Sequence, residues 1–533
     1  MARVLVVDDD PEQLEIRRLL LERIGHMVWT SASAEEAWTH FAEHQPKLVI
    51  LDLRLPRTED GLQLIRRMRA ASHDARLLVL SGWTHDLENM PESAMVDHVL
   101  LKPVRSSLLL QMVAKLSLWL MCLAPALSAQ STSTFPFQMD AAAEVVAEME
   151  LSANGADWGR AGREGVMLNV SLDDGAKQQV MIFSGDARHR YRAFLGEVAP
   201  GAHVLKLERH PDYSSRGVQM QAHGVTFRQY KTSDPEYAMI ANAPVLFARP
   251  NTVGKFTDIP LMAYCEKLPD GSLRYSVIFS NEDGGTSTRA LMARWGRVTD
   301  IEHVYQVWPT TKKTLIQTKG HNDVEFHGKY EGRHPLLAVS TDNNMVSDQG
   351  SSAVRYQMAP ILVELGAASR EKVMDENPIT YLISSRELER EGKLRDFGKH
   401  EGTKISLPEN YLVVEMRLLN KDARVALLVR LNEEKFFRMS NLGVHDMGIE
   451  RSGWVRTAIE LPPATQPAQV VEIGFQCMPE VKAEHGGQCR VEGISKMFFL
   501  NAKATPDANF WRPGLDRGPW VIPSGQVRTV PMR

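Results

Sequence analysis

The sequence predicts a multidomain protein that begins with an α/β domain and continues as mainly β-sandwich-like domains. Its 533 residues are enough for three or four domains. Short apolar runs alternate with helical patterns up to about residue 111, whereas closely spaced strand-like runs and turns follow beyond residue 140. With 43% hydrophobic and 24% charged residues, the composition is typical of globular protein and excludes wholesale disorder.

Charge and cysteine content exclude further classes of protein. The net charge of −4 gives no whole-chain basic field for nucleic acid. No helix-turn-helix or basic recognition element follows the first domain, so we expect no nucleic-acid partner. Four cysteines exclude a disulfide-dense scaffold and a Cys-rich zinc module, but they allow one isolated bridge.

The first domain, residues 1–118, is expected to be a doubly wound, parallel, five-stranded sheet. Alternating strands and helices imply a parallel sheet that is covered on both faces. Asp10 before Pro11 is a good N-cap followed by proline at the first helical position. Buried strands are predicted at 3–7, 47–51, 76–80 and 96–101, and helices at 11–24 and 60–70.

Reactive residues follow the predicted strands at their carboxyl ends, where ligands of such sheets bind. They are Asp8, Asp9, Asp52, Ser81 and Lys102. Three carboxylates at one edge repel each other, and a bound Mg²⁺ ion would compensate their negative charge. The set predicts a phosphoryl-acceptor site in which Asp52 is the nucleophile, Lys102 neutralises phosphoryl oxygens and Ser81 donates a hydrogen bond to the new phosphate.

Five motifs in these positions resemble the receiver domain of two-component response regulators, over about a fifth of the chain. They are VLVVDDDPE at 4–12, LVILDLRLP at 48–56, EDGLQLI at 59–65, VLSGW at 79–83 and LLKPV at 100–104. The resemblance implies that Asp8, Asp9, Asp52 and the backbone carbonyl of Arg54 bind Mg²⁺. It also implies that Asp52 receives its phosphate in the cytoplasm from a sensor histidine kinase or a phosphotransfer protein.

The sequence departs from the receiver pattern at two places. Val99 occupies the position where the family usually has a Tyr or Phe that follows phosphorylation, so we expect a small conformational response. The segment 85–94, interrupted by Pro91, is a poor helix. The alternative to an active receiver is an inactive one that is kept as a folding or docking module.

A signal-peptide-like segment at 112–129 overlaps the end of this domain. Lys115 precedes an apolar core at 116–127, and small residues follow before Gln130. Residues 130–139 then form a linker. One alternative is a membrane anchor at 106–127, which would put Lys115 near the middle of the bilayer. The other is a last amphipathic receiver helix. If the segment is a signal, the receiver is cytoplasmic and the β region is exported; if it is an anchor, the β region is membrane-bound.

Beyond the linker we expect three β domains, at 140–235, 236–375 and 376–533. Short, alternating runs separated by turns are typical of antiparallel sandwiches. Strands are predicted at 166–172, 178–184, 191–198, 203–208, 412–418, 425–431 and 470–476.

The central β domain contains a second group of metal-ligand residue types. On a strand, Asp300 and Glu302 share a face because the side-chain period is two. The candidate ligands of a second divalent metal are Asp300, Glu302, His303, His321, Asp323, His327 and His334. The alternative is a polar, solvated sheet face.

The order of these residues distantly resembles two families. One is the fungal vacuolar-sorting-like family, and the other is the necrosis-inducing plant toxins with their acid–Trp–Glu metal motif. Here the position of that Trp is Ile301.

The remaining signals concern the C-terminal domain. Cys477 and Cys489 flank a polar loop and would form a disulfide if this region is exported. Trp454, Trp511 and Trp520 are either core residues or platforms for sugar stacking. The β region is therefore expected to bind a glycan or a metal, or to hydrolyse a polymer. No P-loop, HExxH or serine nucleophile elbow indicates an enzyme class.

Overall fold

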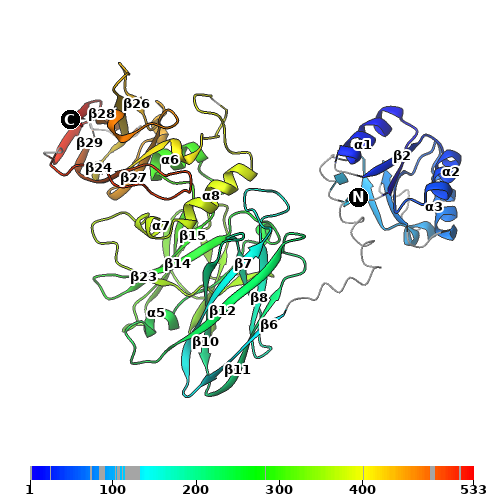
Figure 1. Ribbon diagram of the computed structural model, residues 1–533, viewed down its shortest axis with the longest axis horizontal. Helices are drawn as coiled ribbons and strands as arrows, with labels where there is room; N and C mark the ends of the chain where they lie inside the picture. The colour runs from blue at the N-terminus through cyan, green and yellow to red at the C-terminus, as the bar shows by residue number, and fades with distance from the viewer. Residues whose placement is uncertain are drawn as a thin grey trace. The chain divides into compact units, whose positions relative to one another are not determined.

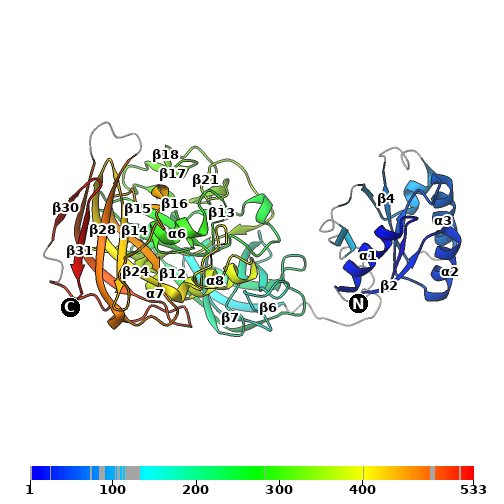
Figure 2. The ribbon, with the colours of Figure 1, turned by 90° about the horizontal axis from the view of Figure 1, so that it is seen from above.

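The chain forms two compact units, residues 1–128 and 129–533. The computed structural model, drawn in Figures 1 and 2, describes residues 3–23, 26–71, 75–82, 90–102, 104, 109–110, 112–113, 132–282, 284–399, 401–480, 487–514 and 518–532. No helix among these residues is both long and apolar enough to cross a membrane. Most of the signal-like segment 112–129 lies outside the described residues.

The first unit is the predicted α/β domain. Its five strands form one parallel sheet in the order β2-β1-β3-β4-β5. The elements are β1 (Arg3–Val7), α1 (Pro11–Arg23), β2 (Met27–Ser31), α2 (Ala34–His44), β3 (Leu48–Asp52), α3 (Thr58–Ala71), β4 (Arg76–Ser81), a 3-10 helix (Pro91–Met95) and β5 (His98–Leu101). The predicted strands and helices are confirmed, except that α3 begins two residues earlier and β5 two residues later than expected.

Alternate residues of the central strands pack into two different cores, one on each face of the sheet. Leu5 and Val7 of β1 lie in a cluster with residues of α2 and α3. Val4 and Val6 lie in another cluster with Leu14 and Leu21 of α1 and with Leu109, Met112 and Val113. Both faces of the sheet are therefore buried, which explains why the sequences of these strands are continuous apolar runs.

The second unit begins with two packed antiparallel sheets. Their orders are β10-β7-β12 and β6-β11-β8-β9, and residues of β7, β8 and β11 meet in one core. Every strand predicted in this part is present, but most of the expected linker 130–139 is not a linker, because residues 133–139 pair with β11 as a further strand. The strands are β6 (Ser133–Met139), β7 (Ala143–Asn154), β8 (Val166–Leu172), β9 (Gln178–Ile182), β10 (His189–Val198), β11 (Gly201–Arg209) and β12 (Gln219–Tyr230).

The middle of this unit contains a six-stranded sheet in the order β18-β17-β16-β15-β14-β23. A second sheet has the order β19-β20-β13-β22, with β21 paired to β20. The strands are β13 (Val245–Phe247), β14 (Pro260–Lys267), β15 (Leu273–Phe279), β16 (Asp300–Val307), β17 (Thr314–Thr318), β18 (Asn322–Glu325), β19 (Tyr330–Glu331), β20 (His334–Val339), β21 (Val346–Ser347), β22 (Arg355–Tyr356) and β23 (Ile361–Val363). The helices are α5 (Tyr237–Ala241), α6 (Thr288–Trp295), α7 (Lys372–Glu376) and α8 (Ile379–Arg390).

The C-terminal part consists of two four-stranded sheets, β27-β24-β29-β30 and β26-β25-β28-β31, around a shared core. The strands are β24 (Tyr411–Lys421), β25 (Ala423–Leu431), β26 (Arg438–Met439), β27 (Gly453–Glu460), β28 (Val470–Pro479), β29 (Gln488–Phe498), β30 (Trp520–Pro523) and β31 (Val527–Pro531). Within the second unit, Figures 1 and 2 show these strands at one end and β6–β12 at the other. The three-domain division remains a prediction, because residues 129–533 form one compact unit.

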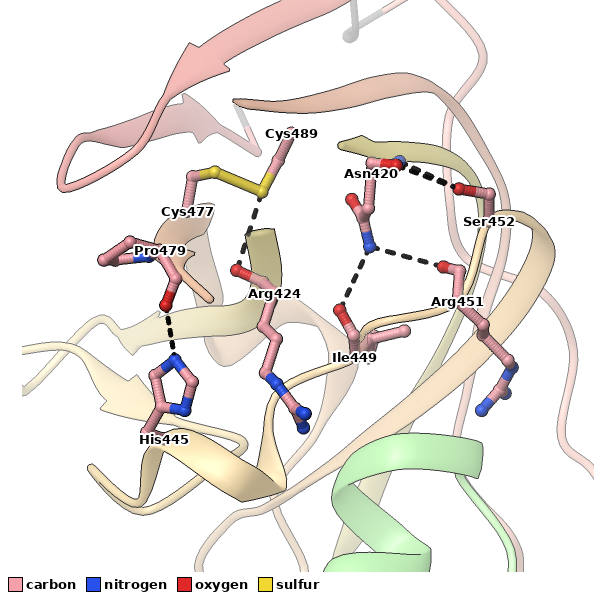
Figure 3. The surroundings of a disulfide bond; sticks show 9 residues. All are labelled: Asn420, Arg424, His445, Ile449, Arg451, Ser452, Cys477, Pro479 and Cys489. Atoms are coloured by element: carbon pink, nitrogen blue, oxygen red, sulfur yellow. Dashed lines mark hydrogen bonds between the residues drawn. A yellow bond between two sulfur atoms is a disulfide. The ribbon is translucent and has the colours of Figure 1, made fainter. Parts of the chain in front are cut away.

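A disulfide bond joins Cys477 of β28 to Cys489 of β29, and therefore connects the two sheets of the C-terminal part (Figure 3). Both cysteines are fully buried. A bridge that closes a loop of this length stabilises the fold by about 3 kcal/mol through loop entropy. Cys265 is a buried free thiol, and Cys122 lies outside the described residues.

Candidate metal centre

The parallel sheet of the first unit brings the sequence-predicted reactive residues to one edge. Asp8 directly follows β1, Asp52 ends β3, Ser81 ends β4 and Lys102 directly follows β5. Because all five strands run the same way, their carboxyl ends lie at the same edge of the sheet. Adjacent pairing of β1 with β3, β3 with β4, and β4 with β5 places these positions next to one another.

Three carboxylates meet at this edge. One oxygen each of Asp8, Asp9 and Asp52 can be chosen so that all lie within 4.8 Å of one another. Asp8 is 1% and Asp52 is 7% exposed, whereas Asp9 is exposed to solvent. Among the described residues, no other group of three or more acidic, histidine or cysteine side chains meets this distance. Hard carboxylate oxygens at such spacing suit Mg²⁺, so the residues present fit the metal that the sequence predicts.

Lys102 lies directly against the carboxylates. Its Nζ is 2.7 Å from Asp52 Oδ2 and 3.3 Å from Asp8 Oδ2. The Lys102 backbone N–H donates to the carbonyl oxygen of Ser81 at 2.8 Å, so these two strand ends are held together. On the other side of Asp52, the Arg54 backbone N–H donates to its Oδ1 at 3.4 Å.

Arg17 is a fifth charged side chain at this edge, and the sequence analysis missed it. This α1 residue is only 6% exposed. Its Nη1 donates to Asp8 Oδ2, and its Nη2 donates to Gln13 Oε1 at 3.2 Å. The sequence feature that could have revealed Arg17 is its position at helical spacing between Leu14 and Leu21, which places a charged residue on the buried face of α1. A buried arginine at such a position requires an anionic partner.

These contacts determine the charge of Asp8. Burial alone would raise the pKa of its carboxyl group, but several interactions outweigh that effect and lower the pKa below the usual value. They are hydrogen bonds from the Arg17 guanidinium and the Asp10 N–H, and the positive charges of Arg17 and Lys102. Asp8 is therefore held as a carboxylate, the form that binds a cation.

The second predicted cluster does not come together as one ligand set. Asp300, Glu302 and His303 are all buried in β16. His321 Nδ1 lies 3.9 Å from Glu302 Oε2, and His303 Nδ1 lies 3.9 Å from Asp323 Oδ1, as two separate pairs. The physical reason is the alternation of side chains along β16: Glu302 and His303 are consecutive, so they point to opposite faces of the sheet and pair with different partners.

The remaining candidate ligands have other surroundings. His334 lies in β20 of a different sheet, where its Nδ1 is 2.8 Å from the Ala243 carbonyl oxygen. The backbone N–H of His327 donates to Asp348. Burial, and then the charge of Asp300, raise the pKa of Glu302 well above its usual value, which favours a neutral carboxyl group. This group does not form the ligand set that the sequence analysis expected.

Comparisons with known proteins agree with the geometry of the first unit. The family model described as "Response regulator receiver domain" matches residues 4–114. The virulence transcriptional regulatory protein PhoP of Salmonella typhi is 34% identical over 157 residues, which are 29% of this chain and 65% of that protein. PhoP of Shigella flexneri is 34% identical over 155 residues, which are 28% of this chain and 64% of the relative. The chain thus spans slightly less than two thirds of the length of these relatives.

Solved structures similar to the chain include two response regulators. A receiver domain protein from Clostridium thermocellum is 24% identical, with a TM-score of 0.22, and the match covers 23% of this chain and 100% of that one. The response regulator TrrA from Thermotoga maritima, in complex with Mg²⁺ and BeF, is 31% identical with a TM-score of 0.21, covering 22% of this chain and 99% of that one. The family model matches residues 4–114, and the parallel sheet carries the acidic residues at its carboxyl edge. Residues 4–114 are therefore a response regulator receiver domain.

Proposed function

We propose that the first unit takes part in phosphorelay signalling by accepting a phosphoryl group on Asp52. The observation that carries this proposal is the contact of Asp52 with Lys102 at 2.7 Å, beside Asp8 and Asp9 at metal-ligating separation. The donor would be a sensor histidine kinase or a phosphotransfer protein, as the receiver family implies. Bound Mg²⁺ would supply positive charge between the carboxylates and the phosphoryl oxygens.

The residues of the chain would act as follows. A carboxylate oxygen of Asp52 attacks phosphorus, a bond to that oxygen forms, and the bond from phosphorus to the donor breaks. Lys102 offsets the negative charge that develops on the phosphoryl oxygens. Ser81, at the end of the neighbouring strand β4, would donate its hydroxyl hydrogen to the phosphate. Asp8 and Asp9 would hold the metal.

Labelling with a small phosphodonor tests this site. Incubation with acetyl phosphate and Mg²⁺ is expected to give an acid-stable, base-labile adduct on Asp52, detected by mass spectrometry. Asp52→Asn should abolish the adduct, and Asp9→Ala should reduce it about tenfold or more. Asp10→Asn is the matched control, because Asp10 caps α1 through Oδ1, a role that Asn also fills. An adduct on Ser81, or labelling that needs no divalent ion, would contradict the proposal.

A second measurement tests the part of Arg17. Arg17→Leu removes a positive charge that contacts Asp8, so Mg²⁺ should bind about three- to tenfold more tightly in isothermal titration. Leucine suits the buried face of α1. Arg18→Leu makes the same change of charge on the exposed face, where Arg18 pairs with Glu15 and Glu22, and should leave the affinity unchanged. Equal affinities for wild type and Arg17→Leu would refute this role.

We propose as a second function that the β region works outside the cytoplasm, with the segment 112–129 as its export signal. The observation that favours export is the Cys477–Cys489 disulfide, because such bonds persist mainly in oxidising compartments. The buried thiol Cys265 has no disulfide partner.

Peptide mapping tests export through this bond. Non-reducing digestion of natively produced protein should yield the Cys477 and Cys489 peptides joined together, and reduction should separate them. Cys265, whose thiol is buried, serves as the internal control for artificial oxidation and should be recovered unpaired. Recovery of Cys477 and Cys489 as free thiols would argue against an oxidising compartment.

A further inference from the structure

Only one of the three tryptophans that the sequence singled out faces a cleft. Trp511 and Trp520 are 5% and 9% exposed and belong to the core between the C-terminal sheets. Trp454, at the start of β27, is only partly buried and lines a cleft of about 820 Å³. Its ring is therefore the one of the three that a ligand can reach.

The cleft lies where the middle and C-terminal parts of the second unit meet. Its walls come from the end of β14, the stretch between β23 and α7, and the residues around the start of β27. The polar and aromatic side chains that matter here are Glu266, Gln317, His321, Arg370, Arg451 and Trp454. A cleft of this size, with one aromatic ring and several polar groups, is typical of sites for organic ligands.

Two arginines of the cleft have hydrogen-bonding capacity left over. Among the described residues, no acceptor receives a hydrogen bond from the guanidinium groups of Arg370 and Arg451; the nearest carboxylate contact of Arg370 is Glu371 at 4.0 Å. Arg451 lies over the ring of Trp295 at 5.0 Å. Glu371 is already bonded by Arg297, whose Nε donates to its Oε1 at 3.1 Å.

The electrostatic surroundings of Arg451 favour an anionic ligand there. Burial, together with the charges of Arg370, Arg297 and Arg294 and against the opposing effect of Glu371, lowers the pKa of Arg451 to about 9. An added carboxylate would relieve this repulsion. Burial also raises the pKa of the Glu266 carboxyl group.

The backbone that carries Arg451 is held firmly in place. Asn420 Nδ2 donates to the carbonyl oxygens of Ile449 at 3.0 Å and Arg451 at 3.3 Å, and its backbone N–H donates to Ser452 Oγ at 2.9 Å. Asn420 is paired across the sheet with Cys489 of the disulfide. Figure 3 shows the Arg451 side chain extending away from these bonds. The backbone position from which the guanidinium extends is thus fixed, which lowers the entropy cost of ordering this segment on binding.

We propose that this cleft binds a carboxylated sugar chain, with a uronate carboxylate between Arg370 and Arg451 and a sugar face against Trp454. Guanidinium groups bind carboxylates through paired, charge-assisted hydrogen bonds. The apolar face of a sugar ring packs against an indole, while Gln317 and His321 offer hydrogen-bonding groups for hydroxyls. This site does not depend on the phosphorylation of Asp52, and it holds whether or not the region is exported.

Isothermal titration of the full chain tests the proposal with a matched pair of ligands. Trigalacturonate should bind in low salt, and galactotriose, which has hydroxymethyl groups in place of carboxylates, should bind at least about tenfold more weakly. Arg451→Gln, Arg370→Gln and Trp454→Ala should each weaken trigalacturonate about tenfold. Arg190→Gln, which changes an exposed arginine outside this cleft, and Trp38→Ala in the first unit are the controls.

Several outcomes would overturn the proposal. They are no binding of trigalacturonate, equal binding of the two trisaccharides, and unchanged affinity in all three cleft variants. Tighter binding of inorganic phosphate or of a single-stranded oligonucleotide would assign the arginines to a phosphate ligand instead. If Arg451→Gln loses its thermal unfolding transition, the partly exposed Arg370 and Trp454 still decide the matter. Because the titration is done on purified protein, its failure leaves the tests of Asp52 labelling and export unaffected.

Discussion

The first unit depends on the balance of charge at the carboxyl edge of its sheet. Two carboxylates, those of Asp8 and Asp52, are almost completely buried there. Buried charges without partners cost several kcal/mol, so this edge is stable only with nearby cations. Lys102 and Arg17 provide them and, in doing so, connect β5 and α1 to the ends of β1 and β3. Three carboxylates against two cationic side chains leave an excess of negative charge, and this excess would attract a divalent metal ion.

Local patterns predicted most of the fold. Continuous apolar runs identified the buried parallel strands, and alternation identified strands such as β11, where Leu205 and Leu207 are buried, because burial imposes a period of two on a sheet face. The acceptor residues were found because they directly follow those strands. Arg17 was missed because its partner Asp8 lies nine positions away, across a turn from strand to helix. The second group of candidate ligands is not one set, because the consecutive Glu302 and His303 point to opposite faces of β16 and His334 lies in a different sheet, which residue spacing does not reveal.

The residues near the boundary between the two units bear on whether the segment 112–129 is a signal sequence or part of a membrane anchor. Leu109, Met112 and Val113 pack in the core of the first unit with Val4 and Val6 of β1. They therefore cannot also lie in a membrane while that core is intact. The apolar stretch that remains, residues 114–127, is shorter than the roughly 20 residues a spanning helix needs. A stretch of this length fits the apolar core of a signal sequence better than a membrane-spanning helix, in keeping with our proposal of export.

The N-terminus of the mature protein, sequenced from the source cell, tests most directly whether the two units work in separate compartments. Our proposal of export, which the disulfide of the β region supports, predicts a mature species that begins near Gln130 and lacks the receiver. A full-length chain in the soluble cytoplasmic fraction would contradict that separation, and the same chain in the membrane fraction would show an anchor in place of a cleaved signal.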